Sequence, residues 1–386
     1  MDIAVLIRGS KRMCAPTQAD AENSTSPSIH PGPAFAMENP DMNGSLWSRL
    51  PEDLVERVLA WLPAASLLRL RTVCRKWSEL IATKCFLEVC SQVATYEPYF
   101  VKISNCEHSR SLLSFDPSIH KWHNVPISYL PAEVGFPVSS AGGLICFINK
   151  LQAHMGDECG VLFVSNPLTK TWKELPRFLC KQRPVLVSMI MWKRPSHYKV
   201  IVAGVLSTEI FDSVQGVWRN TGCLPRGEEV SRNVAYCNGS LYCLTPRWYN
   251  CVLLAFSIQD EVWSKVKTGR LPGYCQFRNL VTCKGHIVIV GKSVRHQVLS
   301  VCVWLLEWKT MKWREAGRMP QRMSDHFLGR PSESFYCCSH GDLIFLTRDK
   351  CDMGLLFDLG QNMWRWVVGC PNLDGFSFEP RLDSQV

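Results

Sequence analysis

The hydrophobic pattern divides the chain into three parts. Residues 1–44 hold few large apolar residues and many Pro, Ser, Asn, Asp and Ala, a composition typical of a disordered leader. Residues 45–90 repeat apolar positions at helical spacing. From residue 93 onward, short runs rich in β-branched and aromatic residues alternate with Gly, Pro, Asn and Asp turns. The pattern predicts a small helical domain over 45–90 and an all-β domain over 93–382.

The first predicted helix lies in the stretch RLPEDLVERVLAWLP, residues 49–63. Pro51 suits a first-turn position, the acidic residues after it favour the positive end of the helix dipole, and Pro63 ends the helix. Its apolar face contains Leu54, Val55, Val58, Leu59 and Leu62, and Trp61 lies on a neighbouring face. The predicted helical domain, residues 45–90, is of a size that seldom folds alone. Its apolar residues exceed what three short helices need for a core. We expect it to dock either on the β domain or on a second protein.

The β region contains six repeats, each aligned on a tryptophan. The anchors are Trp122, Trp172, Trp218, Trp263, Trp313 and Trp364, separated by 50, 46, 45, 50 and 51 residues. Six positions before each anchor stands a turn-type or acidic residue, whose side chain can bond nearby backbone N–H groups. Such a period accommodates four short strands, and a four-stranded sheet cannot cover its own apolar faces. The repeats therefore predict a propeller of six blades.

The first repeat is one strand short. Residues 374–380, with the sequence DGFSFEP, are predicted to supply the missing strand and close the ring. Upstream of the tryptophans a Gly turn often opens an apolar strand. Only Gly142–Gly143 is a true Gly pair, and the repeat ending at Trp218 has no Gly turn where one is expected.

Two families resemble these motifs. The stretch LPEDLVERVLAWLPAASLLRLRTVCRKWSELI resembles an F-box, with its Leu-Pro opening and its Val-Cys-x-x-Trp-x-x-Leu-Ile end. The β repeats resemble kelch-repeat propellers, which carry a Gly pair, an aromatic residue and a spaced Trp. The whole chain is similar to plant F-box/kelch proteins. The expected fold class is α+β multidomain, with a small three-helix F-box followed by an all-β six-bladed kelch-type propeller.

The resemblance implies a non-catalytic substrate receptor. F-box proteins dock on a Skp-type adaptor and through it on the cullin and RING subunits of an SCF-type ubiquitin ligase, while the propeller holds a protein substrate. Carried over residue by residue, the adaptor surface comprises Leu50, Pro51, Leu54, Val58, Leu59, Leu67, Leu68, Val73 and Trp77. The alternative is that some of these, Trp77 and Leu80 especially, serve the helices' own core.

A candidate substrate surface follows from the expected strand order. If Gly turns join the first and second strands and acidic turns join the third and fourth, the opposite face carries the second-to-third loops and the links between blades. Basic and aromatic residues concentrate there, as an acidic or phosphorylated segment would require. The candidates are Trp192, Lys193, Arg194, His197, Tyr198, Arg247, Trp248, Tyr249, Lys292, Arg295 and His296. The alternative is that these loop charges are solvated and only keep the protein soluble.

Composition narrows the class of protein. With 46% hydrophobic and 20% charged residues the chain is typical of a globular protein, and no apolar run approaches the ~20 residues of a membrane span. The formal charge of +9 favours an anionic partner. The 19 cysteines are odd in number and lack Cys-x-x-Cys spacing. We expect reduced thiols in a nuclear or cytoplasmic protein, rather than a zinc cluster or a disulfide frame.

Three other functions compete with that of a substrate receptor. An enzyme lacks support, because the chain has no metal-spaced His cluster, no GxxxxGK phosphate loop and no Gly-x-Ser-x-Gly elbow. A nucleic-acid-binding propeller is permitted by the charge but would leave the F-box unexplained. An adaptor-binding scaffold or small-ligand sensor without a role in ubiquitination stays open. We expect no cofactor, no membrane partner and no nucleic acid.

Overall fold

A computed structural model describes most of the chain from residue 50 to residue 386. The described ranges are 50–93, 98–106, 109–149, 160–179, 184–193, 197–204, 207–225, 228, 230–231, 233–245, 251–273, 278–328, 334–348, 351–370 and 375–386. The predicted leader, residues 1–44, lies outside them. The chain divides into two compact units, Met1–Leu62 and Pro63–Val386. None of the described helices is long and apolar enough to cross a membrane.

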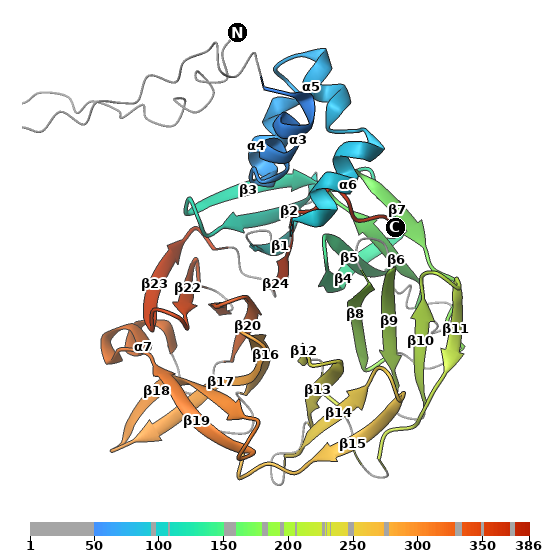
Figure 1. Ribbon diagram of the computed structural model, residues 1–386. Helices are drawn as coiled ribbons and strands as arrows, with labels where there is room; N and C mark the ends of the chain where they lie inside the picture. The colour runs from blue at the N-terminus through green and yellow to red at the C-terminus, as the bar shows by residue number, and fades with distance from the viewer. Residues whose placement is uncertain are drawn as a thin grey trace, which may run out of the picture. The chain divides into compact units, whose positions relative to one another are not determined.

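In the described part of the chain, four short helices precede the β region (Figure 1). They are α3 (Glu52–Ala60) in the first unit, and α4 (Ala64–Leu70), α5 (Arg75–Leu80) and α6 (Lys84–Gln92) in the second. Prolines occupy the N-cap positions of α3 and α4, where their missing N–H groups cost nothing. Thr83 caps α6 by accepting a hydrogen bond from the Phe86 backbone N–H at 3.2 Å. Each helix is seven to nine residues long apart from the six-residue α5.

The β region forms six four-stranded antiparallel sheets arranged in a ring (Figure 1). The first sheet has the order β24 (Gly375–Phe378), β1 (Tyr99–Cys106), β2 (Ser109–Asp116) and β3 (Lys121–Pro126). The second contains β4 (Val134–Ala141), β5 (Leu144–Asn149), β6 (Leu162–Asn166) and β7 (Thr171–Glu174). The third contains β8 (Leu186–Lys193), β9 (His197–Ala203), β10 (Thr208–Asp212) and β11 (Val217–Asn220).

The other three sheets also follow chain order. The fourth contains β12 (Val234–Cys237), β13 (Ser240–Leu244), β14 (Leu253–Ser257) and β15 (Val262–Val266). The fifth contains β16 (Asn279–Cys283), β17 (His286–Arg295), β18 (Val298–Glu307) and β19 (Lys312–Arg318). The sixth contains β20 (Phe335–His340), β21 (Leu343–Arg348), β22 (Met353–Asp358) and β23 (Met363–Val368). The six-bladed propeller predicted from the repeats is thus confirmed.

The first sheet joins the two ends of the β region. β24 pairs with β1 in the register Phe376↔Val101 and Ser377↔Phe100, and it also lies beside the inner strands β4 and β20 of the neighbouring sheets. This strand lies within residues 374–380, the segment that the sequence predicted would supply the missing strand of the first repeat. The ring therefore closes through main-chain hydrogen bonds between strands far apart in the sequence.

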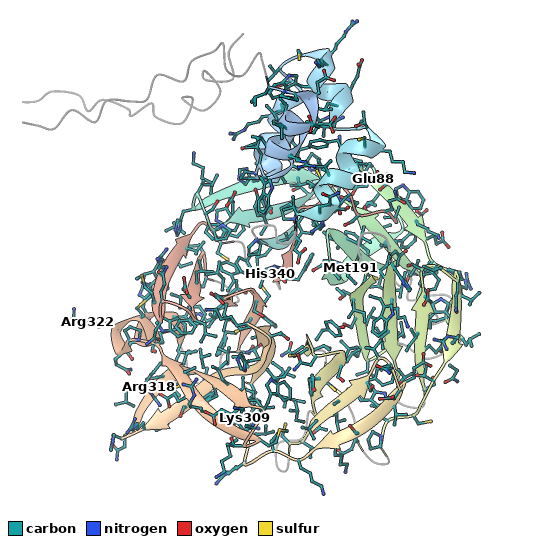
Figure 2. All side chains as sticks on the ribbon, in the orientation of Figure 1. Glu88, Met191, Lys309, Arg318, Arg322 and His340 are labelled. Atoms are coloured by element: carbon teal, nitrogen blue, oxygen red, sulfur yellow. The ribbon has the colours of Figure 1, made fainter. Side chains whose placement is uncertain are left out.

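The core consists of layers between adjacent sheets, and side chains fill the space between the ribbons (Figure 2). Both faces of the middle strands are apolar, which explains continuous buried runs such as Leu144–Phe147 in β5. Between the sixth and first sheets, Phe345 stacks on Phe100 and Phe115, with ring centroids 5.1 and 5.9 Å apart. Each such side chain contributes about 1.5–3 kcal/mol through burial.

The repeat tryptophans all lie on the outermost strand of a sheet. Three of them bond to the preceding sheet or its edge. Trp122 Nε1 donates to the Val368 carbonyl at 2.9 Å, and Trp263 Nε1 donates to Thr208 Oγ1 at 2.8 Å. Trp218 Nε1 donates to the carbonyl of Pro176, just after β7, at 2.6 Å. These three tryptophans therefore join one blade to the next.

The turn before each tryptophan also repeats. The acidic or Asn side chain at its start accepts backbone N–H groups, as when Asp358 Oδ1 accepts the Gln361 N–H at 2.9 Å. Two residues before each tryptophan the backbone is left-handed, with φ between 51° and 70°. The residues there are His120, Lys170, Gly216, Glu261, Met311 and Asn362. Five of the six turns thus place a side chain where glycine would be favoured.

The segment after β24 folds over the second sheet. Asn166, fully buried, donates its two amide hydrogens to the carbonyls of Arg381 (3.0 Å) and Ser384 (2.9 Å). The Ser384 hydroxyl bonds to the Gly142 carbonyl. A Cβ on Gly143, whose φ is 85°, would lie 2.7 Å from Arg381 Cβ. The one true Gly pair of the sequence is therefore required by both its turn and the close approach of this segment.

One helix was not predicted. α7 (Gln321–Leu328) lies between β19 and β20, with Phe327 and Leu328 buried against the fifth and sixth sheets. Its Gln321 donates to the Leu299 carbonyl of β18 at 3.2 Å. Arg322 points outward at the rim of the ring (Figure 2).

Candidate interaction surfaces

An apolar stripe runs along α3. Leu54, Val58 and Trp61 are 40%, 44% and 70% exposed, although each is a large hydrophobic side chain. Their spacing of four and three residues places them on one side of the helix. Pro51, just before the helix, is also exposed. Trp61 was not among the predicted adaptor residues. It follows Val58 by three residues, a spacing that places both side chains on the same side of a helix and could have identified it.

The remaining adaptor candidates are not all accessible. Leu59 and Leu67 are 5% and 1% exposed and belong to the core, so their assignment to a binding surface was wrong. Their positions face inward because an amphipathic helix also needs a buried side. Val73 is 36% exposed. Leu50, Leu68 and Trp77 are half-buried, and Leu68 lines a cavity described below.

The predicted substrate residues do not share one face. Residues 192–198 connect β8 to β9, the first and second strands of the third sheet. In an antiparallel sheet this connection lies at the end opposite the second-to-third loop. The sequence-based prediction that 192–198 is a second-to-third loop was therefore wrong, because this segment contains no glycine to mark it as the connection between the first and second strands.

Side chains at the end of β8 and the start of β9 contact each other and Asp212, the last residue of β10. His197 Nε2 lies 3.0 Å from Asp212 Oδ1, and Lys199 Nζ lies 3.9 Å from Asp212 Oδ2 and 4.6 Å from the centre of the Trp192 ring. Burial opposes ionisation of Asp212, but hydrogen bonds from His197 and two backbone N–H groups outweigh it and lower the carboxyl pKa. Tyr198 is 1% exposed, and burial raises its pKa to about 12. Trp192 is half-buried.

The β17–β18 hairpin carries the accessible part of the predicted surface. Its strands are ten residues each, and Arg295 and His296 at its tip are exposed. Two exposed valines, Val294 and Val298, flank them at 45% and 43%. Lys292, in contrast, is fully buried, so its place among the substrate residues was wrong. Arg194, Arg247, Trp248 and Tyr249 lie outside the described residues, as does the side chain of Lys193.

The buried cysteines behave as core residues. Cys146 and Cys243 lie in the middle of apolar strands, and burial raises the pKa of each thiol to about 12. Cys337 and Cys338 pack into different inter-sheet layers, as expected of neighbours on one strand. Within the described ranges, no three His, Cys, Asp or Glu side chains are grouped so that they could hold a metal ion.

Two family models match the chain. The F-box domain matches residues 47–88, and the KIB1-4 beta-propeller matches residues 72–361. The chain belongs to the F-box proteins with a KIB1-4 β-propeller. This F-box protein is 30% identical over 347 residues to F-box only protein 6 of Arabidopsis thaliana, which covers 86% of this chain and 71% of that protein.

Two further relatives extend over nearly the same length. The F-box/kelch-repeat protein At3g61590 of Arabidopsis thaliana is 26% identical, over 88% of this chain and 90% of that protein. SKP1-interacting partner 15 of the same plant is 23% identical, over 88% of this chain and 99% of that protein. The predicted resemblance to plant F-box/kelch proteins is therefore confirmed. The propeller family that matches is KIB1-4, while kelch appears in the names of relatives.

Proposed function

We propose that this F-box protein is the non-catalytic substrate receptor of an SCF-type cullin–RING ubiquitin ligase. Its F-box would bind a Skp-type adaptor, and its propeller would hold the target protein. The observation that carries the proposal is the exposed stripe Leu54, Val58 and Trp61 on α3, inside the residues matched as an F-box. The printed name of a relative, SKP1-interacting partner 15, also supports it.

The energetics favour a helix-in-groove contact. Exposed apolar side chains spaced along one side of a helix are the anchors by which such a helix enters a groove. Burying a fully exposed side chain of this size gains about 1.5–3 kcal/mol, and less than half of Leu54 and of Val58 is exposed. Truncating both would therefore weaken binding by roughly ten- to fiftyfold. Leu54 and Val58 both lie on the surface, so truncating these two side chains to Ala should leave the fold unchanged.

The test is calorimetric titration of the purified full chain with a Skp-type adaptor. We expect tight binding of the wild type and a roughly ten- to fiftyfold loss for the double variant Leu54→Ala/Val58→Ala. The matched control is Val262→Ala, which truncates a 58% exposed valine on the outer strand of the fourth sheet and should leave binding unchanged. Equal adaptor binding by the double variant and the control would overturn the assignment of α3.

We further propose that the β17–β18 hairpin contacts an acidic or phosphorylated segment of the target. Arg295 offers a planar guanidinium to carboxylate or phosphate, and Val294 and Val298 beside it offer apolar contact. Binding of the full chain to a degenerate phosphopeptide library should fall for Arg295→Glu and not for Lys121→Glu, an equal charge change on exposed Lys121 of β3. A selected peptide set that is unchanged by Arg295→Glu would exclude this hairpin.

We propose that the complex acts in the nucleus, the cytoplasm or both. The fourteen cysteines assigned in the described ranges are free thiols, which suits a reducing compartment. Fluorescence microscopy of the tagged full chain tests this, and a secreted or lumenal distribution would contradict it.

A further inference from the structure

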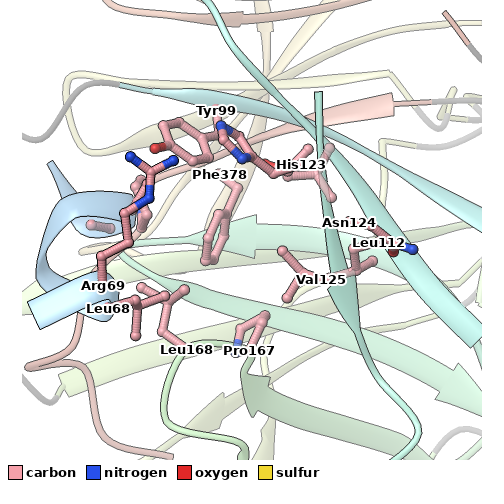
Figure 3. A pocket seen from close by; sticks show the side chains of 15 residues that line it. Leu68, Arg69, Tyr99, Leu112, His123, Asn124, Val125, Pro167, Leu168 and Phe378 are labelled. Atoms are coloured by element: carbon pink, nitrogen blue, oxygen red, sulfur yellow. The ribbon is translucent and has the colours of Figure 1, made fainter. Parts of the chain in front are cut away.

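A cavity of about 230 Å³ lies between α4 and the first sheet (Figure 3). Both walls belong to the unit Pro63–Val386. Leu68 and Arg69 of α4 form one wall, and the other is a single face of the sheet, because Ser114 pairs with His123 on one side and with Val101 on the other. The opposite face of this sheet packs on the sixth sheet. The cavity therefore opens on the face of the first sheet that is turned toward the second.

Ser114 departs from the repeat at this cavity. It stands eight residues before its tryptophan, and the equivalent residues of the second to sixth sheets are Val164, Ile210, Ala255, Leu305 and Leu356. All five are apolar and buried. Ser114 is equally buried, at 2% exposure, yet its hydroxyl oxygen has no hydrogen-bond partner among the residues that the structure describes. A buried polar atom left unpaired costs about 1–3 kcal/mol, so packing alone does not explain the serine.

His123 departs in the same place. It follows its tryptophan directly, where the other sheets carry exposed Lys173, Arg219, Ser264, Arg314 and Arg365. The His123 ring is instead partly buried and lies parallel to Tyr99, with centroids 6.1 Å apart. Within the described part of the chain its buried Nε2 atom has no hydrogen bond, and Asp116 Oδ2 lies 4.0 Å from it. Asp116 itself accepts the backbone N–H and the hydroxyl of Ser118.

The remaining walls separate by chemistry. Leu112, Phe378 and Leu68 supply apolar surface. Figure 3 shows the Arg69 guanidinium on the same side as Tyr99 and His123, away from Pro167 and Leu168. A ligand with a flat apolar body and one anionic end matches this arrangement. A dry cavity of about 150 Å³ accepts benzene, so the present volume suits a body of about two fused rings.

We propose that this cavity binds a small arene carboxylate, with the carboxylate paired to Arg69 and bonded to His123 or Ser114, and the rings packed on Leu112, Phe378 and Leu68. Arg69 provides two parallel N–H donors for a carboxylate. The site joins α4 to the first blade, so an occupant would brace the helix against the propeller.

The probe is 2-naphthoate, titrated into the full chain by calorimetry, with 2-naphthalenemethanol and 2-naphthylmethylamine as the uncharged and cationic analogues. Because a hydrogen bond to a charged group exceeds a neutral one by about 1 kcal/mol or more, we expect the acid to bind about tenfold more tightly than the alcohol, and the amine not to bind. The adaptor is absent from this titration, so its result is independent of the ligase proposal.

Three variants locate the site, and a fourth, Arg71→Gln, is the control. Ser114→Leu installs the residue of the fifth and sixth sheets, fills the cavity and should abolish binding without lowering the melting temperature. Ser114→Ala removes the hydroxyl alone and should weaken binding several-fold. Arg69→Gln should remove the preference for the acid over the alcohol, whereas Arg71→Gln, an exposed arginine outside the cavity, should not.

Two results would overturn the proposal. If none of the three probes binds at millimolar concentration, or if the acid binds Ser114→Leu as well as wild type, the cavity is not the site of such a ligand. If the alcohol binds as tightly as the acid, the anionic part of the proposal is wrong.

Discussion

Asn166 offers the sharpest test of how the ring is held together. In the other sheets the equivalent turn residue is Asp, Ser or Glu, and such a side chain only has to accept a backbone N–H. Asn166 does this through Oδ1, which accepts the Leu168 N–H at 3.0 Å, and it also donates to two carbonyls of the segment after β24. Replacing it with Asp keeps the size and the accepted bond, but turns a double donor into a charged acceptor.

The expected cost of Asn166→Asp follows from this geometry. Two hydrogen bonds are lost, each worth about 1 kcal/mol, and the Arg381 and Ser384 carbonyls then face a carboxylate oxygen in a buried site. We expect the free energy of unfolding to fall by about 2–4 kcal/mol at pH 7. Urea unfolding followed by tryptophan fluorescence measures this loss, and carboxypeptidase digestion reports whether residues 379–386 detach first.

Acid should reduce the effect. Unsolvated carbonyls raise the folded-state pKa of the introduced carboxyl above its unfolded value of about 3.9. A raised pKa stabilises the folded state at low pH and destabilises it as pH rises through the folded value, so the deficit should shrink toward pH 4. The control is Asp358→Asn, whose parent accepts only a turn N–H and should lose less than about 1 kcal/mol. Equal losses for the two variants would refute the donor role of Asn166.

Three further predictions concern the turns, the tryptophans and the ion pair of the third sheet. Lys170→Gly, at φ 58°, should raise the free energy of unfolding by about 0.5–1 kcal/mol, whereas a loss in urea unfolding would contradict the left-handed turn. Trp263→Phe should cost about 1–2 kcal/mol in the same assay, because it leaves the buried Thr208 hydroxyl unpaired; Trp172→Phe, on a ring without that bond, should cost less than half as much. The lowered pKa of Asp212 stabilises the fold above the unfolded pKa, and this is lost as pH falls through the folded value. The stability gap between wild type and Asp212→Asn should therefore widen as pH rises from 3 to 5, and a gap that is flat over this range would refute the lowered pKa of Asp212.

Most of the fold was accessible from the sequence because a propeller repeats one local design. The tryptophan and its preceding turn recur at fixed distance, so six weak signals in register predicted six sheets. Strand order failed only in the third sheet, where residues 192–198 contain no glycine to mark the first turn. α7 was missed because eight residues inside a link give too short a helical pattern.

The surfaces were less accessible because burial depends on what covers a residue. Lys292 and Tyr198 belong to strands that extend into the core, and no local pattern separates them from loop residues. Leu59 and Leu67 belong to the same F-box motif as Leu54, yet their side chains are buried whereas that of Leu54 is exposed. One feature of the sequence does indicate the cavity. When the six repeats are aligned on their tryptophans, Ser114 is the one polar residue at its position.

Closure of the first sheet by β24 imposes an order on synthesis. β1, β2 and β3 leave the ribosome before the other five sheets, yet their inner partner is made after β23. Until then the inner edge of β1, including Val101 and Phe100, has unpaired main-chain groups that can join any passing strand. A nascent chain halted before residue 375 would therefore be an open ring with an aggregation-prone edge. Cellular quality control would recognise it as misfolded, although more than twenty strands would already have formed.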